Sequence, residues 1–312
     1  MAPAFGATVS PEAQNYPERP IRLIDPYAPG GGSGLVARLI GPKLSEAWGK
    51  QVVVDNRPGA AGAIGTEITA RAVPDGHTLC MGTSGSIAIS PNVNKVPFDP
   101  VKDLIPITQT SAQSMLVVLH PSVPINSVQE LIAFAKAQPN KIAFASSGTG
   151  GSGHLAAELF MALTKVSMIH VPYKGNGPAV LAQVSGEVQL GFNNILAVLP
   201  HANSGRLKAI AVTSAKRARA APNVPTLIEA GVPGYEASSW NGIFAPAKTP
   251  RPIINKIHAE VVRVLNMPDV RERLVAAGSD PVGNTPEEFL AYVKLELARW
   301  GKLIRDNNIR AE

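Results

Sequence analysis

The chain alternates short apolar runs with longer segments in which apolar residues recur every three or four positions. The run 21–26 predicts a strand, and the segment 34–48, with Leu35, Leu39 and Leu44 on one face, predicts a helix. Strands and helices that alternate in this way are typical of parallel sheets with right-handed crossovers. The same pattern predicts strands at 51–55, 78–83, 115–119, 141–145, 167–171, 188–192 and 208–213, and helices at 63–72, 127–137 and 153–163.

The last third of the chain is different, with helices predicted at 252–265, 268–277 and 286–305 and no series of strands. We expect these helices to return to the first part of the chain, so that the backbone crosses between two domains near 110–114 and near 238–242. Two such crossings form a hinge. The sequence therefore predicts an α/β fold of two lobes, each a mostly parallel sheet flanked by helices. Domain 1 is expected at residues 1–113 and 239–312, and domain 2 at residues 114–238.

Two glycine-serine loops follow predicted strands and precede predicted helices. The first is Pro29-Gly30-Gly31-Gly32-Ser33-Gly34, and the second runs from Ser146 to Gly153. Small side chains let backbone N–H groups face outward, and a helix N-terminus adds partial positive charge. The two loops indicate a small anion held from two sides.

The second loop also matches the dinucleotide-binding pattern at Gly148, Gly150 and Gly153. The strand after it ends in Pro172-Tyr173-Lys174, without the acidic residue that would hold a ribose. Neither loop continues into the Gly-Lys-Ser/Thr of a triphosphate site, and no serine has both glycines of a hydrolase nucleophile turn. A nicotinamide-dependent or acyl-transfer enzyme remains the alternative, but we predict no enzyme and no cofactor.

The histidines offer no metal site by their spacing. All six are widely separated, and Cys80 is the single cysteine, so we predict neither a metal site nor an internal disulfide. His154 lies in the first turn after the second glycine loop, where ligand contact and packing explain it equally well.

The composition, 45% hydrophobic and 17% charged, is that of a globular protein. A net charge of +6 favours anionic partners, but the densest basic cluster, Lys216-Arg217-Ala218-Arg219, is typical of a solvated turn, and we predict no nucleic-acid partner. No apolar stretch approaches the roughly 18–20 residues of a membrane span. Residues 1–20 resemble the polar lead-in left after a signal peptide has been removed.

Short hydroxyl side chains gather on the loops that follow predicted strands. Ligands of open parallel sheets bind just outside these strand ends. Hydroxyls and backbone N–H groups hold a carboxylate without reacting with it, although each serine alone is equally explained as a helix cap. The hydroxyl residues concerned are Ser33, Ser84, Ser146, Ser147, Thr149 and Ser152.

A series of motifs runs in order from Tyr16 to the end of the chain. On these motifs the chain resembles the Bug-type periplasmic solute-binding proteins, which are the receptors of tripartite tricarboxylate transporters. The motifs are Tyr16-Pro17-Glu18-Arg19-Pro20, Pro29-Gly30-Gly31-Gly32, Val53-Val54-Asp55-Asn56-Arg57-Pro58-Gly59, Pro74-Asp75-Gly76-His77-Thr78-Leu79, His154-Leu155-Ala156-Ala157-Glu158-Leu159-Phe160, Val171-Pro172-Tyr173-Lys174-Gly175, Val224-Pro225-Thr226, Glu229-Ala230-Gly231 and Pro233-Gly234-Tyr235.

The resemblance implies a two-lobed fold like that of periplasmic binding proteins, closing on a small carboxylate. It implies a periplasmic, monomeric receptor that delivers its ligand to membrane transporter subunits; a ligand sensor for signalling would use the same cleft. The expected ligand-binding residues are Pro29, Gly30, Gly31, Gly32, Ser33, Ser84, Gly85, Ser146, Gly148, Thr149, Gly150, Gly151, Ser152, His154, Tyr173 and Asn193.

The chain departs from the family's pattern at two positions. Gly34 stands where the family commonly has Asp after the first glycine run, and Asn193 stands where it commonly has Asp after the phenylalanine. Both departures remove a negative charge near the expected cleft. A carboxylate is easier to bury where no like charge is close, whereas an amino acid would lose a partner for its ammonium group. We therefore expect a dicarboxylate or an aromatic carboxylate rather than an amino acid.

Overall fold

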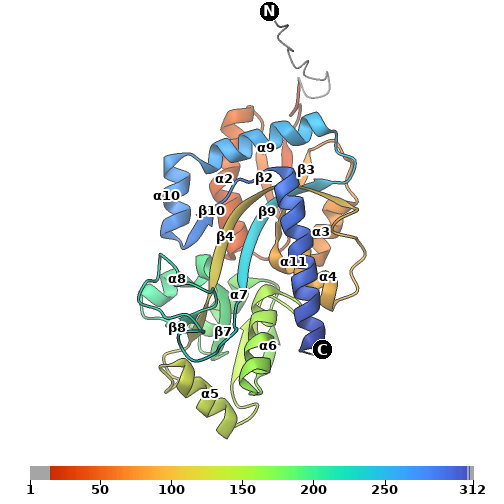
Figure 1. Cartoon of the computed structure of the whole chain (residues 1–312). Coiled ribbons are helices and arrows are strands. Elements are labelled where there is room, and N and C mark those ends of the chain that lie inside the picture. The colour runs from red at the N-terminus through yellow and green to blue at the C-terminus, as the bar shows by residue number, and fades with distance from the viewer. Residues whose placement is uncertain (1–14, 308, 310–312) are drawn as a thin grey trace, which may run out of the picture.

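The computed structural model describes residues 15–307 and residue 309, which form a mixed sheet flanked by helices (Figure 1). The strands are β1 (Ile21–Asp25), β2 (Val52–Asn56), β3 (Thr78–Thr83), β4 (Leu104–Leu119), β5 (Ala143–Ser146), β6 (Ile169–Pro172), β7 (Leu190–Asn194), β8 (Lys208–Val212), β9 (Ser238–Pro246) and β10 (Ser279–Pro281). The helices are α2 (Gly32–Trp48), η1 (Ala60–Gly62), α3 (Ala63–Ala70), η2 (Ser84–Ile89), α4 (Ser90–Val93), α5 (Val128–Ala137), α6 (Ser152–Thr164), α7 (Asn176–Val184), α8 (Ile195–Asn203), α9 (Arg251–Leu265), α10 (Pro268–Ala276) and α11 (Pro286–Asp306).

The sheet joins two groups of parallel strands. Its order is β2-β1-β3-β9-β4-β7-β5-β6, with β10 and β8 also paired to β4. Strands β2, β1 and β3 are mutually parallel, and so are β7, β5 and β6, which confirms the alternation predicted from the sequence. Between the two groups, β9 and β4 pair in the antiparallel sense with each other and with their neighbours β3 and β7.

Strand β4 begins well before residue 115, where the sequence pattern starts it. Its first part, from Leu104 to Ser114, pairs with β9, and the part from Met115 to Leu119 pairs with β7. The crossings expected near 110–114 and 238–242 therefore lie inside paired strands. The domain boundaries at 113/114 and 238/239 remain a prediction.

The helices close the ends and faces of this sheet. Helix α2 begins two residues earlier than predicted and continues through Pro42 without ending. In the last third of the chain, α9 packs on α2 and β4, while α11 packs on η2, α4 and β4. No helix in the described part of the chain is long and apolar enough to cross a membrane.

Helix α11 fixes the aromatic core through one buried carboxylate. Phe289, Trp300 and Trp240 are almost completely buried. Glu296, which is 2% exposed, accepts hydrogen bonds from the indole N–H groups of Trp240 (3.1 Å) and Trp300 (3.2 Å). These bonds tie α11 to β9, because Trp240 belongs to that strand.

Candidate functional site

A narrow cavity lies where helices from both groups of strands begin. Its volume is about 30 Å³, which is room for about two water molecules or one carboxylate group. Five of its lining residues belong to three described helices or their caps: Gly31, Gly32 and Ser33 of α2, Ser152 of α6 and Asn176 of α7. The other lining residues are Tyr27, Thr83, Ser147, Asn194, Ser239 and Asn241.

The starts of these three helices leave backbone N–H groups without partners in their own helix. Gly31, Gly151 and Gly175 are the N-cap residues of α2, α6 and α7, and none of them supplies a side-chain cap. No acidic residue lies in the first turn of any of the three. The N–H groups and the positive ends of the helix dipoles are therefore available to a bound anion.

The remaining walls add neutral side chains. Tyr27 donates its hydroxyl hydrogen to the carbonyl of Ala61 (2.9 Å) and lies 3.2 Å from Oγ1 of Thr83. Asn194 caps α8 by accepting from the N–H of Leu196 (3.0 Å). No charged side chain of the described residues lines the cavity. The arrangement suits an anion held through dipoles and hydrogen bonds rather than through an ion pair.

One carboxyl group does lie close behind this wall. Asp25, at the end of β1, is 0% exposed and accepts a 2.7 Å hydrogen bond from the hydroxyl of Ser33. Burial raises its pKa to about 6, although the hydrogen bond from Ser33 acts in the opposite direction. The expectation that this side of the cleft has no nearby acid, because Gly34 stands in place of Asp, is therefore corrected.

The predicted residues divide between this cavity and its surroundings. Gly31, Gly32, Ser33 and Ser152 line it. Pro29 and Gly30 pack against Gly177, at the start of α7. Ser84 shares a 3.2 Å hydrogen bond with Ser239, a lining residue.

Gly85, a predicted residue, allows the starts of η2 and α6 to approach each other closely. A Cβ atom at Gly85 would lie 2.8 Å from the Tyr27 hydroxyl and 3.2 Å from the backbone nitrogen of Ser152. A side chain here would therefore separate η2 from the N-terminus of α6.

A second, larger hollow of about 520 Å³ shares Ser147 with the cavity. The predicted residues Gly148, Thr149 and Tyr173 line this hollow. Its other lining residues are Gly59, Ala60, Ala61, Asn94, Lys95, Pro172 and Lys174.

Three predicted residues form a network beneath the second glycine loop. His154 is 1% exposed, accepts from the N–H of Gly150 (3.1 Å) at Nδ1, and stacks on His170 with ring centres 4.1 Å apart. Ser146 lies 2.6 Å from Nε2 of His170. Burial, and then the neighbouring His154, lower the pKa of His170 to about 3, so its ring is neutral at pH 7. These contacts shape the loop. None of the three predicted residues, Ser146, Gly150 and His154, lines the cavity.

Asn193 is buried against a different partner. Its Nδ2 donates to Oε1 of Gln183 (2.7 Å), while the next residue, Asn194, lines the cavity. Gly151 is the N-cap of α6. The binding roles assigned to all the predicted residues, those that line the cavity included, stay predictions.

Sequence reasoning missed Tyr27, Thr83, Asn176, Ser239 and Asn241 as lining residues. Thr83 and Asn176 each stand where a strand or loop passes into a helix, which is the one signal that marks them. Ser239 and Asn241 lie in β9, and no sequence motif marks them.

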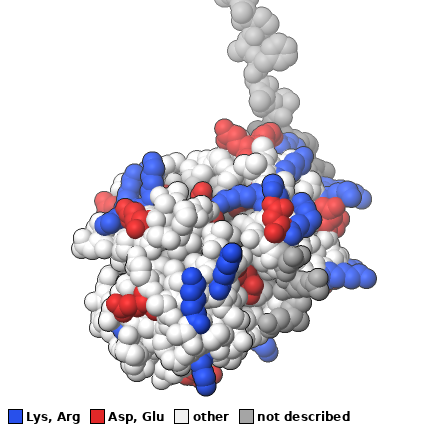
Figure 2. Space-filling view, turned by 60° about the horizontal axis from the view of Figure 1, so that its bottom comes forward, with Lys and Arg blue, Asp and Glu red and all other residues white. Residues whose placement is uncertain are grey.

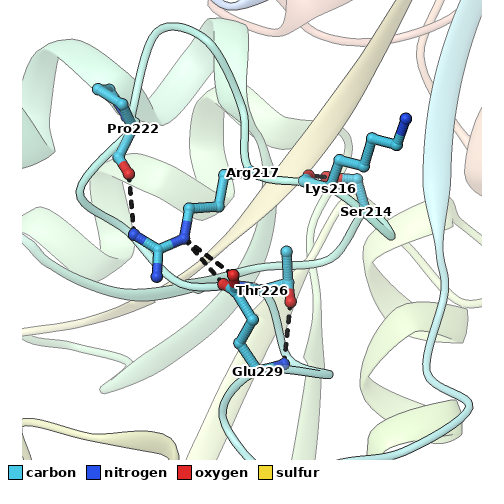
Figure 3. A network of polar contacts seen from close by, with 6 residues as sticks. All are labelled: Ser214, Lys216, Arg217, Pro222, Thr226 and Glu229. Carbon is cyan, nitrogen blue, oxygen red and sulfur yellow. Dashed lines mark hydrogen bonds and ion pairs between the residues drawn. The ribbon is translucent and has the colours of Figure 1, made fainter.

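Charged groups outside the cavity are spread over the surface. Figure 2 shows blue and red side chains interspersed on the face drawn there. In the basic cluster at 216–219, Arg217 is bound by Glu229 (2.8 Å) and by the carbonyl of Pro222 (3.1 Å), as Figure 3 shows. The cluster is thus a turn held by its own ion pair. The described residues hold no group of three or more potential metal ligands.

Comparison with known proteins agrees with this geometry. Residues 36–309 match the model of the tripartite tricarboxylate transporter family receptor. Protein BugT of Bordetella pertussis is 35% identical over 98% of this chain and 94% of its own length.

Three solved structures share the fold along nearly their whole length. Rpa4515 of R. palustris, solved with adipate, is 34% identical (TM-score 0.91) and covers 95% of this chain and 99% of its own. The periplasmic binding protein BugD is 32% identical (TM-score 0.91) over 95% of this chain and 100% of its own. MatC from Rhodopseudomonas palustris, with bound malate, is 31% identical (TM-score 0.89) over 93% and 100%.

These relatives are periplasmic solute-binding proteins and not enzymes, so the dehydrogenase and acyl-transfer alternatives are excluded. The chain belongs to the family of tripartite tricarboxylate transporter receptors, as a periplasmic solute-binding protein of the Bug type.

Proposed function

We propose that this receptor captures a small dicarboxylate, with one carboxylate group held in the cavity, and delivers it to membrane transporter subunits. The observation that carries the proposal is the neutral lining: three helix N-termini without side-chain caps or first-turn acids meet at one cavity. Free N–H groups at helix starts stabilise a buried anion without a counter-ion.

The size of the cavity supports a ligand that extends beyond it. A volume of about 30 Å³ takes one carboxylate group, and Ser147 lines both this cavity and the neighbouring hollow of about 520 Å³. Lys95 and Lys174 line that hollow and suit a second carboxylate, while Ala61, Pro172 and Tyr173 suit an aromatic ring. Adipate and malate, the ligands of two related structures, are both dicarboxylates.

The amino-acid class fits less well. A buried ammonium group is stabilised best by an acceptor that carries negative charge, and the lining side chains offer only neutral acceptors. Asp25, the nearest acid, is fully shielded behind Ser33.

We infer that the protein is a monomer with two lobes, one formed by residues 1–113 with 239–312 and the other by residues 114–238. We also infer that the two lobes close on the ligand. All four of Gly31, Ser33, Ser152 and Asn194 line the cavity, and by these bounds the first two belong to one lobe and the last two to the other. An anion that contacts both sides favours the closed arrangement because it binds that state more tightly.

The test is calorimetric titration with adipate, malate, benzoate, aspartate and glutamate. We expect adipate, malate or benzoate to bind in the micromolar range or tighter and the amino acids to bind at least tenfold more weakly. Binding of aspartate or glutamate alone contradicts the proposed ligand class. Absence of binding by every member contradicts carboxylate capture. Size-exclusion chromatography with light scattering checks the monomer.

A further inference from the structure

Asp25 occupies the space that a side chain at position 34 would need. A Cβ atom built on Gly34 would lie 2.7 Å from Oδ2 of Asp25 and 2.5 Å from a guanidinium nitrogen of Arg38. Oδ2 also accepts a 2.9 Å hydrogen bond from Nδ2 of Asn56. The carboxyl group of Asp25 is therefore built into the start of α2, although it belongs to β1.

The hydrogen bond between Ser33 and Asp25 determines what Ser33 presents to the cavity. An ionised carboxylate only accepts hydrogen bonds, so the single hydroxyl proton of Ser33 points to Oδ1 of Asp25, 2.7 Å away. The oxygen of Ser33, which lines the cavity, then has only lone pairs left for a ligand. A bound carboxylate would face an acceptor at this point.

One proton reverses this arrangement. A protonated Asp25 donates its own O–H to Oγ of Ser33, and the hydroxyl proton of Ser33 becomes free for the ligand. We propose that Asp25 is a positioning residue that takes up one proton from solvent when a carboxylate binds, so that Ser33 turns from acceptor to donor. The inference rests on the proposed function and adds to it a coupling between carboxylate capture and protonation.

Among the described ionisable groups that face Asp25, none has a pKa shifted toward neutral pH as that of Asp25 is. Arg38, on α2, is held by the carbonyl of Gly34 (3.1 Å) and by Oδ1 of Asn56 (2.6 Å), and its charge lowers the pKa of Asp25. Burial raises the pKa of the Cys80 thiol, on β3, to about 12, and burial raises the pKa of the Tyr27 phenol far above its ordinary range. Burial also raises the pKa of Asp25 to about 6, so a nearby anion needs to raise it only a little further to protonate it near neutral pH.

The experiment is titration of the full chain with adipate and with malate at pH values from 5.5 to 8.5. Uptake of one proton tightens binding by up to tenfold for each unit of pH decrease; because Asp25 is already partly protonated at pH 6, we expect about fivefold or more between pH 8 and pH 6. At pH 7.5, calorimetry in buffers with different ionisation enthalpies measures the proton uptake directly and needs no variant.

Variants assign the proton to Asp25. Asp25→Asn, whose amide can donate to Ser33 permanently, is expected to bind with the same affinity at pH 6 and pH 8. Ser33→Ala is expected to lose most of the tightening at low pH. The control is Asp55→Asn, an acid on the adjacent strand that pairs with Arg22 and Arg57 at the surface, and it should keep the wild-type slope.

Three outcomes contradict the inference. Wild-type affinity that is the same at pH 6 and pH 8, or binding without proton uptake, refutes the coupling and leaves carboxylate capture standing. A wild-type slope that persists in Asp25→Asn assigns the proton to another group. Absence of binding at every pH contradicts the proposed function itself.

Discussion

Replacement of Gly31 by leucine should close the cavity without unfolding the protein. Gly31 is the N-cap of α2, with φ −87° and ψ 168°, an extended conformation that any residue adopts. Its nearest neighbour is Cβ of Asn176, 3.7 Å from the position of an added Cβ atom. A longer side chain would grow between the starts of α2 and α7 and fill a cavity of about 30 Å³.

The expected loss follows from the hydrogen bonds that the side chain would block. A hydrogen bond from N–H to a charged acceptor contributes about 1.5–3 kcal/mol. Loss of two such bonds weakens binding by about 3–6 kcal/mol, or about 10²–10⁴-fold in Kd. The change of N-cap residue lowers the free energy of unfolding by only about 1 kcal/mol, or no more than about 4 °C in Tm.

Calorimetry with adipate and thermal unfolding measure the two effects separately. The matched control is Gly41→Ala in the same helix, where the added Cβ atom has ordinary contacts of 3.8 Å and lies outside the cavity. Gly150 is a poorer choice, because its φ is +82° and a Cβ atom there would lie 2.4 Å from Nδ2 of Asn94. Undiminished affinity in Gly31→Leu would show that this cavity is not the carboxylate site.

Three further predictions concern single side chains. Asn194→Asp keeps the helix cap but adds a negative charge to the cavity, so adipate affinity at pH 8 should fall by about tenfold or more in calorimetry; unchanged affinity contradicts the anion site. Because Asp25 binds its proton more tightly folded (pKa about 6) than unfolded (about 4), its contribution to stability is full below about pH 4 and is lost as the pH rises through 6. Relative to the wild type, the free energy of unfolding of Asp25→Asn should therefore rise by about 2 kcal/mol between pH 4 and pH 8 in denaturant unfolding, and a constant difference refutes this. Glu296→Leu leaves the indole N–H groups of Trp240 and Trp300 unpaired and should lower the free energy of unfolding by about 2–5 kcal/mol, with adipate affinity intact; a Tm within 2 °C of wild type contradicts it.

The strands and helices that pack on an apolar face could be predicted, whereas a strand with buried polar side chains could not. Strand β3 was predicted with its observed bounds, and β1 differs by one residue at its end. The first part of β4 carries Thr108, Ser111 and Gln113, all of which are buried in the structure. Hydrophobic periodicity does not reveal such a segment, because its polar side chains pair through tertiary contacts such as the bond from Asn241 to Ser111 (3.0 Å), and Nε2 of Gln113 has no partner among the described residues.

The candidate site was predictable where local sequence builds it and unpredictable where distant segments meet. The loop before α2 supplies lining residues as expected, since a glycine N-cap is a local feature. Asn193 and Asn194 are adjacent in sequence, but successive side chains of a strand point to opposite faces, so only Asn194 lines the cavity. The position of Asp25 behind Ser33 depends on how β1 and α2 pack, and no spacing along the chain encodes it.

Strands β4 and β9 run as a paired ribbon between the two groups of parallel strands, with Leu104 opposite Pro246 at one end and Ser114 opposite Ser238 at the other. Ladder hydrogen bonds resist sliding of one strand along the other, whereas the twist between paired strands varies over a wide range, even though β3, β7, β8 and β10 also pair with parts of these two strands. Rotation of one half of the molecule against the other would therefore change the twist of β4 and β9 and store elastic energy in them. Their restoring torque would act whether or not a solute is present. The lifetime of a closed receptor would then depend on the elasticity of the ribbon as well as on the strength with which the carboxylate is held.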